Sequence, residues 1–403
     1  MVPMKRLALF FMVLCLLLCG CGKRPGTDTQ LPSENTTDIE STPVETPEPT
    51  PSEPEYSQLP LIAVSVPAVI DYAYNGSGDA IFRHTRQNMM LVLQDPEIAD
   101  KIIVDFLNRI EETTPQAQIV YDAALECEEA PPAPYSFDLL YNPTRIDQSV
   151  LSLYGTQVSW SGGIHPNYVC ISANYDMVTG DVLTLGSILD SVDAIDPLYD
   201  LILDELQNME EDCGLFPGYQ ETVHDMLFGE ESYNETWYFS ASGLCFYFSP
   251  YEIAPYASGI ITVELPYESL TGIIGDGFFP PERDTASGVV CASRMQDIQL
   301  DQFTQIAEVI IDQGGEKVFI YTEQAVYDVR LEVGYWDETM SEFYPSYIAF
   351  AAYTLTPGDA IMAETYIPDV LPSLRLTYTS GNETVSVFIH QSGQDGSIYL
   401  MDG

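Results

Sequence analysis

The sequence predicts an α+β protein in which helices pack on antiparallel or mixed sheets, followed by a C-terminal all-β, sandwich-like domain. Three observations support this fold class. Apolar residues recur every three to four positions in segments that begin at Asp95-Pro96 and Asp196-Pro197, as in amphipathic helices. Strand-like segments lie before, between and after these two. Beyond residue 285, strands that alternate apolar and polar residues predominate, as in half-buried antiparallel sheets.

The first folded segment is predicted to open with a strand at 61–66 and to continue into the clearest helix of the chain. Asp95 suits the N-cap, and Pro96 suits the first helical position. The run Thr113-Thr114-Pro115 is expected to end this helix. Its apolar face repeats every four residues, at Ile98, Ile102, Phe106 and Ile110.

The middle of the chain is predicted to hold two further helices among strands. One runs from Asp196 to Gly214, because glycine is typical of a helix C-terminus, and the other covers 219–228. A turn at 178–180 is expected to pair a strand at 168–175 with residues 182–185. Further strands are predicted at 148–155, 237–239, 244–248 and 259–265, the second and third of these forming a hairpin.

The C-terminal region 285–403 is predicted to be a separate β-sandwich. Strands at 374–378 and 385–389 flank a Ser-Gly-Asn turn, whereas segment 300–311 fits a helix and a strand equally well. Segment 325–333 alternates strictly in polarity. One face of that segment is expected to hold Tyr327, Val329, Leu331 and Val333.

Residues 1–20 predict a lipoprotein signal peptide. Lys5 and Arg6 precede an apolar run at 7–18, which is too short to span a bilayer. Small residues then precede Cys21, as in bacterial lipoprotein signals, so cleavage there would leave a cysteine that carries lipid. The alternative is an ordinary signal peptide with chance cysteines. We therefore expect a chain anchored by lipid to the outer face of the cytoplasmic membrane and exposed to the cell wall.

Residues 21–58 are expected to form a disordered spacer behind this anchor. Segment 22–58 contains seven prolines and consists otherwise mostly of Thr, Ser, Glu and Asp. Such a composition cannot bury enough apolar surface to offset the entropy of the chain. The folded part is then predicted to comprise domains at 59–155 and 156–280, followed by the sandwich at 285–403.

The charge of the chain is strongly negative. Asp and Glu number 61 and Lys and Arg only 14, giving a net charge of −47. A charge of this sign repels nucleic acid and anionic lipid and attracts cationic partners. The alternative interpretation is that an exported protein is acidic for the sake of solubility alone. Binding to nucleic acid is therefore not expected, and a basic partner is favoured.

The sequence lacks the residue patterns of common catalytic and metal sites. Its four histidines form neither an HxH nor an HExxH motif, and no G-x-S-x-G elbow or P-loop is present. His165 and Cys170 would lie on opposite faces of one strand. A catalytic pair of carboxylates for glycoside hydrolysis stays an open alternative, because 61 acidic residues form many pairs. We expect a protein without catalytic residues, metal or cofactor, with a cell-wall hydrolase or deacetylase as the lesser alternative.

Beyond Cys21 the chain has an odd number of cysteines, and none forms a CxxC pair. Two of them, Cys170 and Cys245, lie in apolar strand-like runs and are expected in the core. One or two disulfides are compatible with an exported protein, but their pairing stays open. The five cysteines are Cys127, Cys170, Cys213, Cys245 and Cys291.

Two motifs carry a family resemblance. The string Trp160-Ser-Gly-Gly-Ile-His-Pro-Asn167 precedes a strand with Asn-Tyr-Asp at 174–176 and a Thr-Gly turn, and a second block lies at 242–256. Together they resemble the extracellular domain of the RsiV-like anti-sigma factors. They also resemble the non-catalytic N-terminal region of the peptidoglycan deacetylase PdaC. The resemblance covers roughly 60–270, and the segment from Asp95 is similar to the smaller module that precedes the motifs in that family.

Because RsiV-like ectodomains bind lysozyme, the resemblance implies that this chain binds lysozyme or another cationic wall-active protein. A peptidoglycan- or glycan-binding module is the alternative, favoured by the 26 tyrosines. The chain departs from RsiV in having a lipid anchor and an added C-terminal domain. Alternatively, the glycines only build a locked turn, and the tyrosines are strand residues. The candidate ligand-binding residues are Trp160, Gly162, Gly163, His165, Asn167, Tyr251 and Tyr256.

Overall fold

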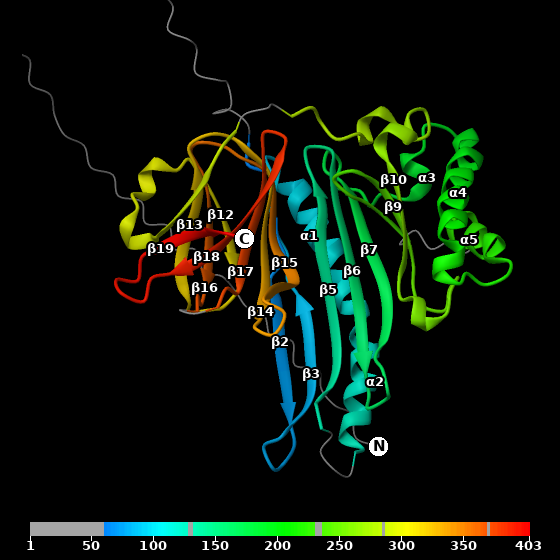
Figure 1. The fold of residues 1–403 in the computed structure, drawn as a ribbon, viewed down its shortest axis with the longest axis horizontal. Helices are drawn as coiled ribbons and strands as arrows, with labels where there is room; N and C mark the ends of the chain where they lie inside the picture. The colour runs from blue at the N-terminus through cyan, green and yellow to red at the C-terminus, as the bar shows by residue number, and fades with distance from the viewer. Residues whose placement is uncertain (1–59, 128–131, 230–235, 284–286, 369–370) are drawn as a thin grey trace, which may run out of the picture. The chain divides into compact units, whose positions relative to one another are not determined.

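Helices and sheets alternate in the first half of the chain and sheets dominate the second, which confirms the predicted α+β fold class with a C-terminal β-sandwich (Figure 1). The computed structural model describes residues 60–127, 132–229, 236–283, 287–368 and 371–403. Cys21 and the predicted spacer at 21–58 lie outside the described residues. Within the described ranges, no helix is both long and apolar enough to cross a membrane.

The first sheet has five strands in the order β2-β3-β5-β6-β7. Only the β3–β5 pair is parallel. Two helices cover one face, where Ile102 and Phe106 of the first pack against Phe137 and Leu139 of the sheet. The elements are β2 (Ala68–Tyr74), β3 (Ala80–Gln87), α1 (Pro96–Glu112), α2 (Thr114–Leu125), β5 (Tyr135–Ile146), β6 (Val150–Trp160) and β7 (Asn167–Asp176).

Helix α1 begins as predicted, because the Asp95 carboxylate accepts the backbone N–H of Glu97 at 2.9 Å. It also ends as predicted, at Glu112. The chain does not leave the helical conformation there, however, since α2 starts at once with Pro115 in its first turn. Proline is tolerated in a first turn, where its missing N–H would have no intrahelical partner. The Thr113–Pro115 signal therefore marks a junction between two helices.

A second core joins two helices to a three-stranded sheet of order β10-β9-β8. The predicted helices, the hairpin and the C-cap at Gly214, with φ +61°, are confirmed. Residues 182–185 differ from the prediction, because only Val182 bridges to Tyr175 before a Thr184 capping box starts a helical turn. The elements are α3 (Leu185–Ile188), α4 (Ile195–Cys213), α5 (Tyr219–Phe228), β8 (Trp237–Phe239), β9 (Gly243–Phe248) and β10 (Ile261–Pro266).

The sandwich consists of a seven-stranded and a four-stranded sheet around one core. Two strands of the larger sheet come from the N-terminal region, β1 (Ala63–Ser65) and β4 (Met90–Val92), and β1 pairs with β15. The ambiguous segment 300–311 holds a 3-10 turn and then β12. The other strands are β11 (Val290–Arg294), β12 (Gln305–Ile310), β13 (Glu316–Thr322), β14 (Val326–Asp337), β15 (Glu342–Leu355), β16 (Asp359–Thr365), β17 (Leu374–Ser380), β18 (Glu383–Gln391) and β19 (Ile398–Asp402).

The strands cross two of the predicted domain limits. The range 285–403 leaves out β1 and β4, and the limit between 155 and 156 falls inside β6. The division into domains stays a prediction. The described residues all belong to one compact unit, Glu53–Gly403, and among them Leu61 is the first residue of the buried cores.

The prediction that Tyr327 shares a face with Val329 and Leu331 was wrong. Val329 and Leu331 lie in the sandwich core, whereas Tyr327 points to the α+β side and meets the Tyr353 ring at 5.9 Å. Asp328 has a φ of +48°, and the pairing with β17 shifts register at this point. A bulge reverses the alternation of side chains, and it cannot be seen in the polarity pattern.

Buried His390 on β18 predicts a dependence of stability on pH. Burial lowers its pKa below the usual 6.5, so the folded chain keeps this ring neutral while the unfolded chain takes up a proton. Stability is therefore lost as the pH falls below about 6.5. Urea unfolding at pH 7.5 and 5.5 checks this. Between these pH values, His390→Phe should lose less unfolding free energy than the parent chain. Some loss remains, because the pKa of His84 is lowered by burial as well.

Candidate functional site

The two sequence motifs meet in space and form an aromatic cluster of His165, Tyr168, Tyr251 and Tyr256. The His165 imidazole stacks on the Tyr256 ring, with centroids 4.0 Å apart and planes inclined by 27°. The Tyr251 ring lies 5.7 Å from Tyr256, and Tyr168 lies 6.4 Å from it. The Tyr256 hydroxyl donates a hydrogen bond of 3.0 Å to the Pro166 carbonyl, which ties the two loops together.

The other candidate residues of the first motif hold its loop in place. The Trp160 indole N–H donates to the Gly163 carbonyl at 2.8 Å, and the indole ring meets Tyr135 edge-on. Gly162 has a φ of +87°, and a Cβ there would lie 2.8 Å from the Tyr135 hydroxyl. Only glycine fits this position without strain. Trp160, Gly162 and Gly163 therefore shape the loop, as the locked-turn alternative expects, and exposed Asn167 opens strand β7.

The aromatic cluster is presented to solvent. The Tyr251 side chain is 62% exposed, and its φ of +75° is rare for a bulky residue. Ile164, between the two motif glycines and His165, is fully exposed. Exposed apolar groups on an ordered loop are typical of recognition surfaces. Tyr251 adopts its positive φ in a tight turn, where its backbone N–H donates to the Ala254 carbonyl at 2.9 Å.

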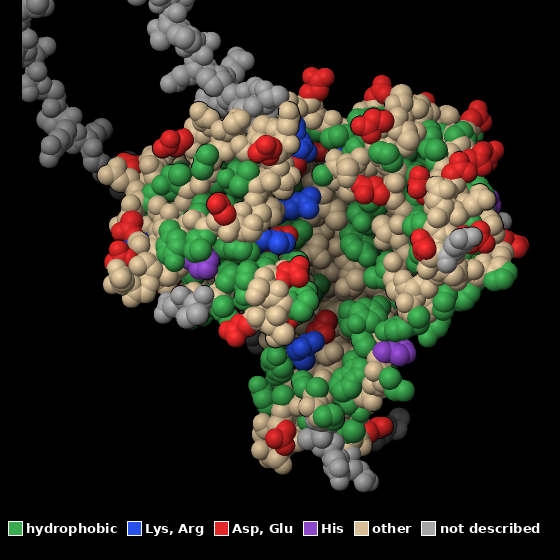
Figure 2. Space-filling model, viewed as in Figure 1, with side chains coloured by type: hydrophobic (Ala, Val, Ile, Leu, Met, Phe, Trp, Pro, Cys, Tyr) green, Lys and Arg blue, Asp and Glu red, His purple; other side chains and the backbone are tan. Residues whose placement is uncertain are grey.

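The sequence segment that contains the cluster carries charge of one sign. From residue 146 to 282 the chain contains 22 Asp and Glu and no Lys or Arg. Many of these acids belong to α4 and α5, and Figure 2 shows acidic side chains over this part of the molecule. The acids of this segment attract positively charged proteins, although Lys101 of α1 pairs with Asp181 within it. The net charge of the chain does not reveal this segregation, whereas the long interval between Arg145 and Arg283 in the sequence does.

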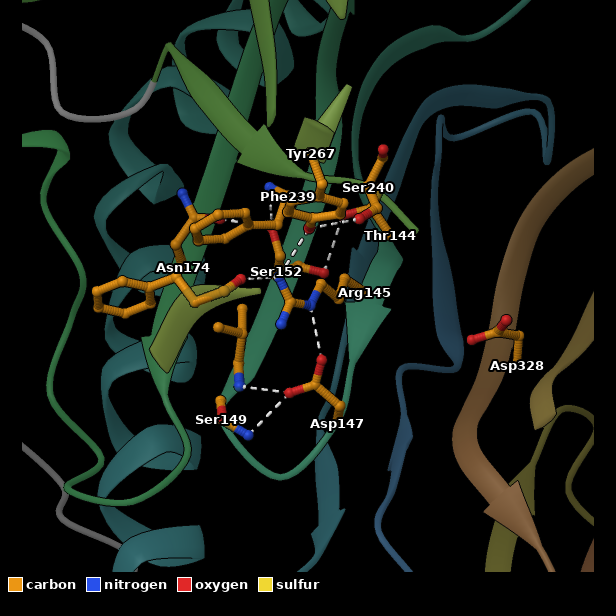
Figure 3. A network of polar contacts seen from close by, with 12 residues as sticks. Thr144, Arg145, Asp147, Ser149, Ser152, Asn174, Phe239, Ser240, Tyr267 and Asp328 are labelled. Atoms are coloured by element: carbon orange, nitrogen blue, oxygen red, sulfur yellow. Dashed lines mark hydrogen bonds and ion pairs between the residues drawn. The ribbon is translucent and has the colours of Figure 1, made fainter. Parts of the chain in front are cut away.

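A buried polar network fastens the second core to the first sheet (Figure 3). Arg145 and Asp147 pair at 2.6 Å, and each side chain is 3% exposed. Arg145 also donates to the Tyr267 hydroxyl at 2.7 Å and to the Phe278 carbonyl at 2.5 Å. Its guanidinium lies 5.1 Å from the centre of the Phe239 ring. Burial raises the pKa of Tyr267 to about 12, so this hydroxyl stays a neutral donor and acceptor.

Ser152 and Asn174 extend the network across β6 and β7. Ser152 donates to the Asn174 side-chain oxygen at 2.5 Å and accepts the backbone N–H of Phe239 at 2.9 Å. Asn174 in turn donates to the Trp237 carbonyl at 2.9 Å. All of these groups are buried, so the network positions strands and offers nothing to a ligand. Asn174, although it belongs to the sequence motif, is therefore a packing residue.

A small cavity lies beside this network. Arg145, Arg283 and Arg330 line it together with Asp147 and Asp328. Its volume is about 10 Å³, which is room for roughly one water molecule. Arg283 pairs with both carboxylate oxygens of Asp328. The cavity lies where strands meet, and it is too small for an organic ligand.

The described residues contain no group of three or more His, Cys, Asp or Glu side chains that would hold a metal ion. The five cysteines in this part of the chain are free thiols. Cys170 and Cys245 are buried as expected, and burial raises the pKa of both. The Tyr154 hydroxyl lies 3.4 Å from the Cys170 sulfur. A buried thiol with a raised pKa is a poor nucleophile at neutral pH.

Residues 187–268 match the family described as "Protein of unknown function (DUF3298)". The chain therefore carries a DUF3298 domain. This domain extends from α3 to the turn after β10 and includes Tyr251 and Tyr256, whereas the His165 loop precedes it. The aromatic cluster thus lies where the DUF3298 domain meets the preceding sheet.

Two solved structures of DUF3298 proteins are similar to this chain. The match with one, from Bacteroides fragilis, has 18% identity and a TM-score of 0.37. It spans 54% of this chain and 94% of that protein's chain. The match with the other, from Pseudomonas aeruginosa, has 16% identity and a TM-score of 0.36. It spans 55% of this chain and 98% of that protein's chain. No curated protein matches the sequence.

Proposed function

We propose that this chain is a lipid-anchored surface protein whose ectodomain binds a cationic wall-active protein such as lysozyme, without catalysis. The observation that carries the proposal is the exposed aromatic cluster within a segment, 146–282, that has no Lys or Arg. Aromatic anchors supply most of the affinity at protein interfaces, and opposite charge speeds their encounter. The resemblance of both motifs to RsiV-like ectodomains supports lysozyme as the first ligand to test.

The anchor and the location belong to the same proposal. Cys21 would carry the lipid, residues 21–58 would act as a spacer, and the binding surface would face the cell wall. A chain held in this way is suited to act as a decoy or a shield against a wall hydrolase.

Calorimetric titration of the unit Glu53–Gly403 with hen-type lysozyme at two salt concentrations tests the proposal. We expect saturable binding that weakens only in part with salt, because the aromatic contacts are not screened. Tyr251→Ala and Tyr256→Ala should each raise Kd about 10- to 100-fold, since they remove central aromatic anchors.

Tyr335→Ala is the matched control, because the Tyr335 side chain on β14 is 59% exposed and lies outside the cluster. It should bind like the parent chain. Binding that disappears at high salt, or that survives loss of both cluster tyrosines, would contradict a docked interface at the cluster.

A glycan is the second candidate ligand, favoured by the exposed Tyr251 ring, since tyrosine rings stack on sugar faces. Purified peptidoglycan sacculi distinguish the two ligands. Retention on sacculi that is lost with Tyr251→Ala and Tyr256→Ala, together with no binding of lysozyme, would assign the cluster to the wall polymer.

A further inference from the structure

Strand β2 is an unpaired edge of the five-stranded sheet. It pairs with β3 on one side, and no strand among the described residues pairs with it on the other. Most of its large apolar side chains are exposed: Val69 41%, Ile70 53%, Tyr72 48% and Tyr74 63%. Edge strands are usually protected by Lys, Pro or a bulge. Segment 68–74 has neither Lys nor Pro, and its register shift with β3 lies at the hairpin tip, between Ala73 and Tyr74.

The β2–β3 hairpin is also electrically neutral. Residues 68–87 hold two acidic and two basic side chains, in contrast to the uniformly acidic segment 146–282. The charge of Asp71, at the middle of β2, is matched by Arg86 at 2.9 Å. Two copies of a chain with a net charge of −47 repel each other over most of their surface. At this hairpin the local side chains add no repulsion of their own.

The two faces of β2 differ. Ile70, Tyr72 and Tyr74 share one face, and the Tyr72 and Tyr74 rings lie 6.4 Å apart. The other face borders two neighbouring hollows of about 450 and 260 Å³ between the hairpin and helices α1 and α2. Both hollows are lined by His84 and Thr114, and the larger is also lined by Leu107. A strand added at the edge would therefore find apolar contacts on one face and open space on the other.

We propose that two copies of this chain pair through their β2 edges in antiparallel fashion, making one continuous sheet. The register that suits the sequence sets Tyr72 opposite its own copy. Ile70 then lies opposite Tyr74 of the other copy, and Asp71 lies opposite Ala73. Aromatic–aromatic and aromatic–β-branched cross-strand pairs stabilise sheets. A shift by one residue on each strand would oppose two Asp71 carboxylates, which disfavours that register.

Disulfide trapping of the full chain in membranes of an expressing bacterium tests the register. Tyr72→Cys should form a disulfide-linked dimer under mild oxidation, since opposed residues of a strand pair lie within disulfide reach. Val104→Cys on α1, with a side chain 57% exposed, controls for random collision, and the parent chain controls for Cys127. Equal yields from Tyr72→Cys and Val104→Cys would overturn the proposal.

Sedimentation equilibrium of the unit Glu53–Gly403 tests the association itself. A dimer is expected, and Tyr72→Lys should weaken it at least about tenfold, because it sets two like charges opposite each other. A monomer at every concentration would overturn the proposal. So would a dimer that Tyr72→Lys leaves unchanged, because such a dimer uses another surface.

Discussion

Replacing Arg145 by Met is expected to lower the free energy of unfolding by about 3–5 kcal/mol. The change leaves the Asp147 carboxylate buried without its cation and removes the donors to Tyr267 and Phe278. An unpaired buried charge is costly because neither water nor another ion solvates it. Urea unfolding followed by tryptophan fluorescence measures the effect, and Trp237 of β8 lies within the affected core.

Lys101→Met is the control for Arg145→Met. It breaks an ion pair to Asp181 in which the two side chains are 51% and 67% exposed. Exposed pairs contribute only about 0–1 kcal/mol, so this variant should be nearly as stable as the parent chain. Similar losses in both variants would mean that the Arg145 network does not fasten the second core to the first sheet.

Trp237→Ala is expected to cost about 3–5 kcal/mol, because it empties the largest fully buried side chain of the second core. Trp237→Phe should cost clearly less. The indole N–H has no hydrogen-bond partner among the described residues, so losing it removes an unsatisfied buried donor along with some volume. Thermal unfolding should give the highest midpoint for the parent chain, a lower one for Trp237→Phe and the lowest for Trp237→Ala.

Val192→Ala provides the surface control for this series. Its side chain is 78% exposed, and the change should alter stability by no more than about 0.5 kcal/mol. If Trp237→Phe were as damaging as Trp237→Ala, the indole N–H would have to make a contact that stabilises the fold.

Elements governed by local rules were predictable from the sequence. The Asp95 cap, the Gly214 C-cap and helix 219–228 follow from capping and periodicity, and the structure confirms all three. The exception within a local element is Tyr327, where one residue with positive φ reverses the face. No composition rule marks a non-glycine residue for that conformation.

Long-range pairing was not predictable in this way. Strand β1 joins the sandwich through Ala63, which pairs with Ala352, nearly the whole folded length away. The candidate site shows the same difference between local features, which were predictable, and long-range contacts, which were not. His165 and Tyr256 were both identified from motifs, but nothing in the sequence pattern alone brings their rings together. A resemblance of motifs indicates which residues matter, whereas the fold decides which of them share a surface.

The stretch without Lys or Arg has a consequence for proteolysis. Proteases that cut after basic residues find no site from Ile146 to Glu282. The bond after Arg145 lies in a buried strand end, and the Arg283 side chain is paired with Asp328. Complete digestion with trypsin is therefore expected to leave the DUF3298 segment 187–268 and the aromatic cluster together in the peptide 146–283.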